Sequence, residues 1–321
     1  MEKAVNAKII KRRIKSVTNT KKMTKAMEMI SAVKMRKAVE TVLGTRLYAR
    51  LGRELMEHLS SLDEPNVPLL EQRPVKKILA VLVSSNRGQC GSFNANLFKK
   101  TRTIFEDIES LTSFRSEQGM TSSHEKDVEI DVLAVGKKSV SFAKKQGYNV
   151  IAVFDTLSEK PSYEDIQPIA QMAMEGFVDK TYDKVVIAFT EYQSSLSQEA
   201  KVRQLLPFSA TELEKMTARM AQHAEEEKKI EDTYPIEGYL FEPGLDVIVD
   251  EVLPRLVEIQ LYQGILESSA SEHSARMVAM KNASENAGDM IIELNLTYNK
   301  ARQAAITQEI AEIAGGAAAL E

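Results

Sequence analysis

The stretch LVEIQLYQGILESSASEHSARMVAMKNASENAGDMIIELNLTYNKARQAA, residues 256–305, has the features of one very long helix. Apolar or small residues recur there at alternating steps of four and three, and no proline follows Pro254. A 3.5-residue repeat over about seven heptads predicts a helix that packs along a second helix as a coiled coil. Only Gln263, His273 and Ser284 interrupt the apolar row, whose positions are Val252, Leu256, Ile259, Gln263, Leu266, Ala270, His273, Met277, Met280, Ser284, Ala287, Ile291, Leu294, Tyr298, Ala301 and Ala305.

The other end of the chain, residues 3–60, is predicted to form the partner helix. At the standard rise it would extend over roughly 85 Å, against roughly 110 Å for residues 245–320. Its apolar stripe is less regular, and the expected members are Ile10, Ile14, Val17, Met23, Met27, Ile30, Leu51, Leu55 and Leu59. Prolines 65, 68 and 74 mark a linker after this helix.

Residues 75–208 alternate between short apolar runs and helical segments, which predicts an open, mostly parallel sheet of the Rossmann type. Strands are expected at 77–84, 129–135, 149–153 and 183–190, with an antiparallel edge strand near 201–208. Helices are expected at 93–109, 137–146 and 163–178. The polar segment 112–127 is expected to be a mobile surface loop, and 211–232 a charged helical excursion.

The predicted fold class is therefore α/β, with a long antiparallel coiled coil of the N- and C-terminal helices and an inserted Rossmann-like domain. The expected divisions are an N-terminal helix at 1–62, the α/β domain at 75–208, a charged excursion and connector at 209–243, and the C-terminal helix at 244–321.

Several classes of protein are disfavoured by composition. The one cysteine, Cys90, excludes an internal disulfide framework, and the four scattered histidines make a structural metal site improbable. The longest apolar run, residues 78–83, is too short to cross a bilayer. The basic N-terminus is not followed by an apolar segment, so no signal peptide is expected; an organelle transit peptide is disfavoured because the helical pattern continues to residue 60.

The net charge of −4 conceals a strong asymmetry. Residues 1–39 contain twelve basic and two acidic residues, so this segment carries about +10 and the remainder about −14. A cationic helix can bind nucleic acid, but residues 1–39 contain no aromatic residue for base stacking. A docking surface for an acidic protein loop is therefore the preferred interpretation.

The turn NRGQCGS at 86–92 is the feature most typical of an enzyme. It lacks the GxGxxG spacing of dinucleotide-binding turns, and the chain contains no phosphate-binding GxxxxGK[ST] loop. Cys90 has no histidine near it in sequence, so a half-buried, inert thiol is preferred over a nucleophile. The sequence predicts no cofactor and no active site.

The C-terminal segment ITQEIAEIAGGAAAL, residues 306–320, keeps a helical stripe but carries no charge after Glu312 until Glu321. Two glycines weaken this helix. It is interpreted either as a frayed tail or as a slim apolar pin that turns in an apolar sleeve.

Both chain ends resemble the γ subunit of F-type ATP synthases of the bacterial type. The resemblance is carried by IKSVTNTKKMTKAMEMI at 14–30, KMRK at 34–37, SSASEHSARMVAMKNA at 268–283 and YNKARQAAITQE at 298–309, and the order of elements extends it over nearly the whole chain. The turn SNRGQCGSFN at 85–94 departs from the family's usual SDRGLCGGLN. The paired cysteines of the redox-regulated chloroplast type are missing.

This resemblance implies a central-stalk rotor, present in one copy per complex, that couples proton-driven rotation of a c-ring to ATP synthesis or hydrolysis. Its implied partners are the α and β subunits of an α3β3 ring, the ε subunit and the c-ring, with catalysis on the β subunits. By analogy, Lys25 and Met27 face an acidic β-subunit loop. Arg276, Gln303, Thr307 and Glu309 are expected to form a polar catch on the C-terminal helix. The implied location is peripheral, on the cytoplasmic face of the bacterial inner membrane. The alternative function is a coiled-coil scaffold with an α/β head that self-associates.

Overall fold

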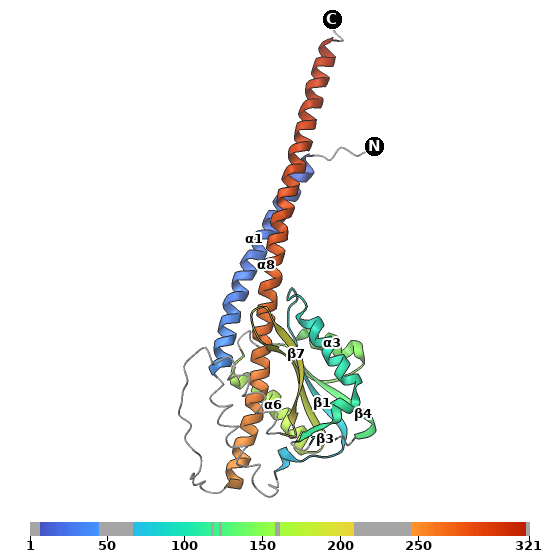
Figure 1. The fold of residues 1–321 in the computed structure, drawn as a ribbon, viewed down its shortest axis with the longest axis vertical. Coiled ribbons are helices and arrows are strands. Elements are labelled where there is room, and N and C mark those ends of the chain that lie inside the picture. Colours follow the sequence, from blue (N-terminus) through green and yellow to red (C-terminus); the bar gives the residue numbers. More distant parts are fainter. Residues whose placement is uncertain are drawn as a thin grey trace. The chain divides into compact units, whose positions relative to one another are not determined.

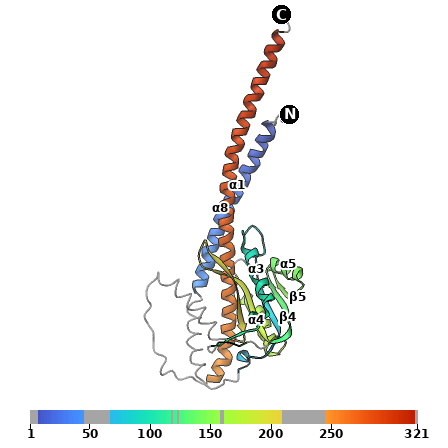
Figure 2. The same ribbon diagram turned by 45° about the vertical axis from the view of Figure 1, so that its right-hand side comes forward.

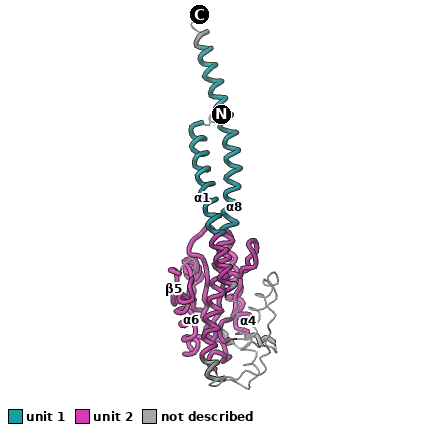
Figure 3. The backbone as a smooth tube through the Cα atoms, turned by 90° about the vertical axis from the view of Figure 1, so that its left-hand side faces the viewer, with its two compact units in different colours: residues 1–32, 276–321 teal, residues 33–275 magenta. Residues whose placement is uncertain are grey.

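The structure is a computed structural model of residues 1–321, and it describes residues 7–44, 67–116, 119–121, 124–157, 161–208 and 245–318. The chain forms two compact units, which Figure 3 shows in different colours. Unit 1 comprises residues 1–32 and 276–321, and unit 2 comprises residues 33–275. The helices α1 (Ala7–Gly44) and α8 (Leu245–Ala318) each contribute residues to both units.

In unit 1, α1 and α8 run side by side in opposite directions (Figures 1 and 2). The apolar row predicted for the C-terminal helix lies on the less exposed face of α8 as far as Ala301. Its members Met280, Ser284 and Ala287 are buried, and the remaining ones from Met277 to Ala301 are partly buried. The prediction of two long antiparallel terminal helices is confirmed, because the 3.5-residue spacing keeps one face of α8 turned inward.

Unit 2 contains a five-stranded sheet with the order β5-β4-β1-β6-β7. Its strands are β1 (Val75–Val83), β4 (His124–Val135), β5 (Asn149–Phe154), β6 (Lys184–Tyr192) and β7 (Gln198–Leu206). All neighbours are parallel except β6 and β7, which are antiparallel. The predicted open sheet, including its antiparallel edge strand, is confirmed. β1 is buried along nearly its whole length because it has neighbours on both sides and helices on both faces.

The helices of unit 2 are α3 (Phe93–Glu106), α4 (Ile108–Thr112), α5 (Lys137–Gln146) and α6 (Tyr163–Val178), with a short 3-10 turn η1 (Pro68–Leu70). A capping box between Ser162 and Asp165 begins α6. Gly147, at a φ of 81°, ends α5 in the left-handed conformation that glycine adopts at little cost.

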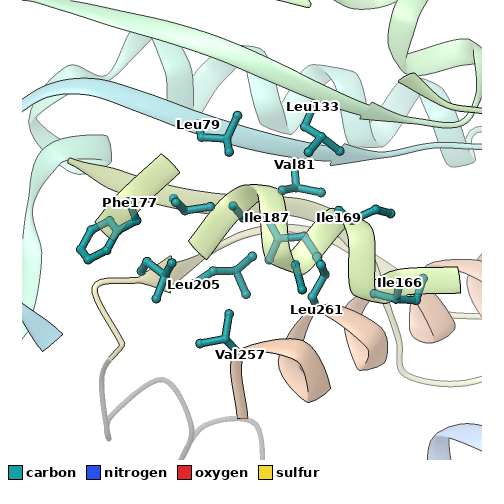
Figure 4. Packing of buried hydrophobic residues seen from close by; sticks show 14 of the residues in the cluster. Leu79, Val81, Leu133, Ile166, Ile169, Phe177, Ile187, Leu205, Val257 and Leu261 are labelled. Atoms are coloured by element: carbon teal, nitrogen blue, oxygen red, sulfur yellow. The ribbon is translucent and has the colours of Figure 1, made fainter. Parts of the chain in front are cut away.

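The hydrophobic core lies on both faces of the sheet. On one face, α6 and the first third of α8 pack against β1, β4 and β6, as Figure 4 shows for Val81, Ile187, Ile169 and Leu261. On the other face, α3 and α5 cover the sheet, and the rings of Phe98 and Phe142 stack at 4.5 Å. The long helix α8 is therefore part of the core of unit 2, in addition to pairing with α1 in unit 1.

The segment 112–127 differs from its prediction. It was expected to be a loop, but it contains a two-stranded antiparallel hairpin, β2 (Phe114–Ser116) and β3 (Gly119–Thr121), and β4 already begins at His124. Such short strands lack the alternating apolar pattern that would reveal them. The predictions for Leu51, Leu55, Leu59 and the charged excursion 211–232 lie outside the described residues.

Candidate interaction surfaces

The part of α1 in unit 1 presents a positively charged surface. All of its basic side chains are exposed, whereas its one acidic residue, Glu28, is partly buried. The basic residues are Lys8, Lys11, Arg12, Arg13, Lys15, Lys21, Lys22 and Lys25. Such a one-sided distribution attracts an acidic partner and speeds its association.

Lys25 and Met27, the two predicted contact residues of α1, lie on different faces of the helix because residues two apart do not share a face. Lys25 is exposed, and its Nζ lies 3.0 Å from Glu28 Oε1. An exposed pair of this kind contributes at most about 1 kcal/mol, so Lys25 remains available to a partner. Met27 is partly buried. The charged contact residue, Lys25, and the apolar one, Met27, therefore lie on different faces of α1.

The predicted inner stripe of α1 needs correction at Met23 and Ile30. Ile10 is buried and Ile14 and Val17 are partly buried, as expected, but Met23 and Ile30 are 62% and 54% exposed. After Val17 the inward face passes through smaller or polar residues, namely Thr24, Glu28 and Ser31, which keep the 3.5-residue spacing. Met23 and Ile30 lie on the outer face instead, with the partly buried Met27 between them, so the basic helix also offers apolar side chains.

The C-terminal part of α8 has an unusual surface. Every residue from 302 to 315 is exposed, and these residues include Ile306, Ile310 and Ile313 at 48%, 62% and 69% exposure. No side chain in the described part of the chain covers them. Burying one such isoleucine in a partner contributes about 1.5–3 kcal/mol, so three of them on one helix form an apolar surface that can stabilise a contact.

The residues of the predicted polar catch occupy two places. Gln303 and Thr307 are one turn apart, and the Thr307 hydroxyl donates to the Gln303 carbonyl oxygen at 3.0 Å. Gln303 and Glu309 are exposed. Arg276, in contrast, is buried at 8% exposure, and it precedes Gln303 by 27 residues, about 40 Å along a helix. Arg276 is therefore not part of the same cluster.

Cys90 is enclosed in a hydrogen-bonded turn before α3. It is 2% exposed, and the Asn94 amide donates to its Sγ at 3.2 Å and to the Ser85 hydroxyl at 2.7 Å. Ser85 Oγ in turn donates to the Arg87 carbonyl oxygen at 2.7 Å. The thiol is more deeply buried than the expected half-buried state. It acts as a polar element of the turn, in a position that a substrate does not reach.

A buried polar cluster on α8 was missed by the sequence interpretation. Gln260, Gln263 and Glu267 are 9%, 2% and 8% exposed, and they face β7 together with Arg203. Burial raises the pKa of Glu267 to about 7, while the charge of Arg203 acts in the opposite direction. Gln263 had been noted only as a break in the apolar row. Its spacing with Gln260 and Glu267, on one face of a helix, was the available signal.

Within the described residues, no group of three or more His, Cys, Asp and Glu side chains is placed to hold a metal ion. The helices searched there include none that is both long and apolar enough to cross a membrane.

Comparisons with known proteins agree with this architecture. A family model described as ATP synthase matches residues 6–320. The ATP synthase gamma chain of Dehalococcoides mccartyi (strain CBDB1) is 41% identical over 318 residues, which cover 98% of this chain and 99% of the relative. That of Legionella pneumophila (strain Corby) is 36% identical over 315 residues, with the same coverage of both chains.

Solved structures resemble the fold. A chain of the Euglena gracilis mitochondrial ATP synthase (OSCP/F1/c-ring, rotational state 3) matches with a TM-score of 0.60 and 18% identity, covering 98% of this chain and 94% of that one. A chain of the rotor of the same assembly in rotational state 1 matches with a TM-score of 0.56 and 17% identity, covering 94% and 98%. At these identities the likeness concerns the fold. The family match and the two bacterial relatives carry the assignment: this chain belongs to the family of ATP synthase gamma chains.

Proposed function

We propose that this chain is the γ subunit of a bacterial F-type ATP synthase, the central rotor shaft that couples c-ring rotation to ATP synthesis or hydrolysis. The observation that carries the proposal is the exposed end of α8. Residues 302–315 continue as a helix with three exposed isoleucines and no covering side chain in the described part of the chain. Exposed apolar side chains gathered on one helix are typical of an interaction site. A sleeve formed by an α3β3 ring is the partner that the family suggests.

The basic surface of α1 supports a second contact. In this proposal Lys25 pairs with an acidic loop of a β subunit, and Met27, with the exposed Met23 and Ile30 beside it, packs against the apolar side of that contact. Lys25 is suited to this because its bond to Glu28 is exposed and weak. Gln303, Thr307 and Glu309 would form the polar catch near the end of α8. Arg276 would act separately from them, because it lies 27 residues before Gln303 on the same helix.

The rotor works by being asymmetric. α1 presents its positive charges on one side of the two-helix unit, so each orientation of the shaft contacts the three β subunits differently. A ligand that binds conformations unequally shifts their populations, and the shaft acts as such a ligand for each β subunit. Catalysis would take place on the β subunits, and this chain would contribute conformational coupling. The ε subunit and the c-ring would complete its partners, at the cytoplasmic face of the inner membrane.

A self-associating coiled-coil scaffold is the alternative, because exposed isoleucines on α8 can also pair with a second copy. Native mass spectrometry of the chain, co-expressed with α, β and ε subunits from the same organism, separates the two functions. The rotor function predicts one copy in an α3β3γε particle with ATPase activity. A homodimer that ignores these partners would favour the scaffold.

A further inference from the structure

Three buried oxygen atoms on one face of α8 have no hydrogen-bond partner among the described residues. They are Gln260 Oε1, Gln263 Oε1 and Glu267 Oε2. The three side chains line one cavity of about 20 Å³ together with Arg203 of β7. Unpartnered buried acceptors are costly, since each loses its bonds to water on folding. Their convergence on a single cavity makes that cavity a site for a small hydrogen-bond donor.

The charges around the cavity are already nearly balanced without Glu267. Glu191 of β6 accepts hydrogen bonds from both Lys201 and Arg203 of β7, and Lys201 also lies 3.3 Å from Glu199. An ionised Glu267 would therefore be a third carboxylate beside two cations. Burial is the main cause that raises its pKa, Arg203 and Lys201 lower it, and Glu191 raises it further.

The donor that fits this cavity must be small and neutral. A metal cation would lie beside the Arg203 guanidinium and would find only three oxygen ligands, fewer than Ca²⁺ or Mg²⁺ take. An anion would meet three acceptors. A single water molecule fits a cavity of about 20 Å³. Water supplies two donors, which leaves one of the three acceptors unsatisfied as long as Glu267 is ionised.

A proton on Glu267 completes this set of hydrogen bonds. Gln263 Nε2 already donates to Glu267 Oε1 at 2.9 Å, so the proton belongs on Oε2. The Oε2 hydroxyl can then donate to the water, whose two hydrogens reach Gln260 and Gln263 Oε1. We propose that Glu267 and one internal water act as a proton-operated latch between α8 and the edge strand β7. Protonation of Glu267 satisfies all three buried acceptors and keeps the cavity closed, whereas ionisation leaves one acceptor unsatisfied and so favours opening of the packing between α8 and β7 to solvent. The proposal does not depend on the proposed rotor function.

The position of the latch gives it a mechanical consequence within unit 2. Gly264, beside the cavity, lets α8 approach β6 so closely that a Cβ there would lie 2.8 Å from Ile187 Cδ1. Because the elements pack this closely, opening of the cavity must loosen the packing of α8 on the sheet. Backbone amides of β7 and of α8 around residues 260–267 would then be exposed to solvent more often. These amides report local opening through their hydrogen exchange.

The test is hydrogen–deuterium exchange of the purified full chain, corrected for intrinsic rates, at about one pH unit below and one above the midpoint near 7. In the unsubstituted chain, exchange in β7 and in residues 260–267 should be about tenfold faster at the higher pH, because the ionised fraction rises from about one-tenth to about nine-tenths between the two conditions. Glu267→Gln, which copies the neutral form, should abolish this dependence. Glu251→Gln, at an exposed position on the same helix, should retain it.

Infrared spectroscopy supplies a second, direct readout. The carbonyl stretch of a buried carboxylic acid should be present at neutral pH, disappear as pH rises, and be missing from Glu267→Gln. An exchange difference that persists unchanged in Glu267→Gln would overturn the latch. If that variant does not fold, the titration of the unsubstituted chain decides alone, and the lack of a carboxylic acid band near pH 7 would overturn the proposal.

Discussion

Lys21 of α1 reaches across Gly288 of α8, so that its Nζ lies 2.9 Å from where a Cβ on residue 288 would be. The glycine leaves room for a charged side chain that occupies an inward position of the heptad pattern. Lysine there is tolerated because its long stem packs against the neighbouring helix while its charge stays near water. The atoms of α1 that a Cβ on residue 288 would meet belong only to the flexible end of Lys21.

Gly288→Ala is expected to stabilise the chain by about 0.5–1 kcal/mol. Alanine favours the helix, and the obstructing atom is the far end of a flexible side chain, which can turn away. Urea unfolding of the full chain measures the effect. Gly315→Ala, at a position with nothing within 4 Å, is the control for helix propensity alone. A loss of stability confined to Gly288→Ala would mean that Lys21 cannot move.

Gly176→Ala should have the opposite effect. Its Cβ would lie 2.7 Å from the ring of Tyr182, which is 6% exposed and whose hydroxyl donates to Asp131 at 3.0 Å. The ring cannot withdraw without breaking that bond, so overpacking should cost about 1–3 kcal/mol. The same unfolding measurement tests this, with Gly288→Ala as the matched substitution. Equal stability of both variants would contradict the prediction.

The pH dependence of stability should reveal Glu267. Its pKa is about 7 in the folded chain, above the ordinary value of 4.5, so proton binding favours the folded state. The stabilisation of the folded state by this proton is complete below about pH 4.5, and it is lost as the pH rises from there through about 7. The difference between the two values corresponds to about 3 kcal/mol as an upper bound. Unfolding free energies of the full chain from pH 5 to about 8 should therefore fall, and Glu267→Gln should flatten this part of the profile. A parallel fall in both proteins would exclude Glu267 as its source.

Met27→Lys should impair coupling more than assembly in the proposed rotor. A new bond between lysine and an acidic β-subunit loop is worth about 1.5–3 kcal/mol, enough to slow release of that contact by about tenfold to a hundredfold. ATP-driven proton pumping per ATP hydrolysed, in membrane vesicles, is the measurement. Met29→Lys is the matched control, since Met29 is 57% exposed and two positions away on another face. Normal pumping by Met27→Lys would refute the contact.

Replacing Ile306, Ile310 and Ile313 with glutamine should weaken the complex and leave the isolated chain intact. The three side chains are already exposed, so the unfolding free energy should change by less than about 0.5 kcal/mol for each. Loss of their burial in a sleeve should cost several kcal/mol, seen as subunit dissociation at lower urea concentration. Leu196→Gln, at an exposed apolar position of unit 2, should not affect assembly. Unchanged complex stability in the triple variant would mean that the end of α8 contacts no apolar sleeve.

Local pattern was enough to predict the long helices and the sheet. The repeat from Met277 to Ala301 recurs at the spacing of one helix face, and β1 and β6 each contain a short apolar run of the kind that is buried on both faces of a sheet. The family motifs are also contiguous in sequence. These properties depend on residues near one another in the chain, so they can be read without tertiary structure.

The tertiary structure decided which polar residues meet and which apolar residues remain outside. Met23 and Ile30 look like core residues, but the inner face of α1 is set by the packing of α8 and passes through Thr24 and Ser31. Arg203 and Glu267 are 64 positions apart in sequence, and only the packing of α8 on β7 brings them to one cavity. Burial and long-range electrostatics depend on the assembled fold, and the periodicity of a single segment does not encode them.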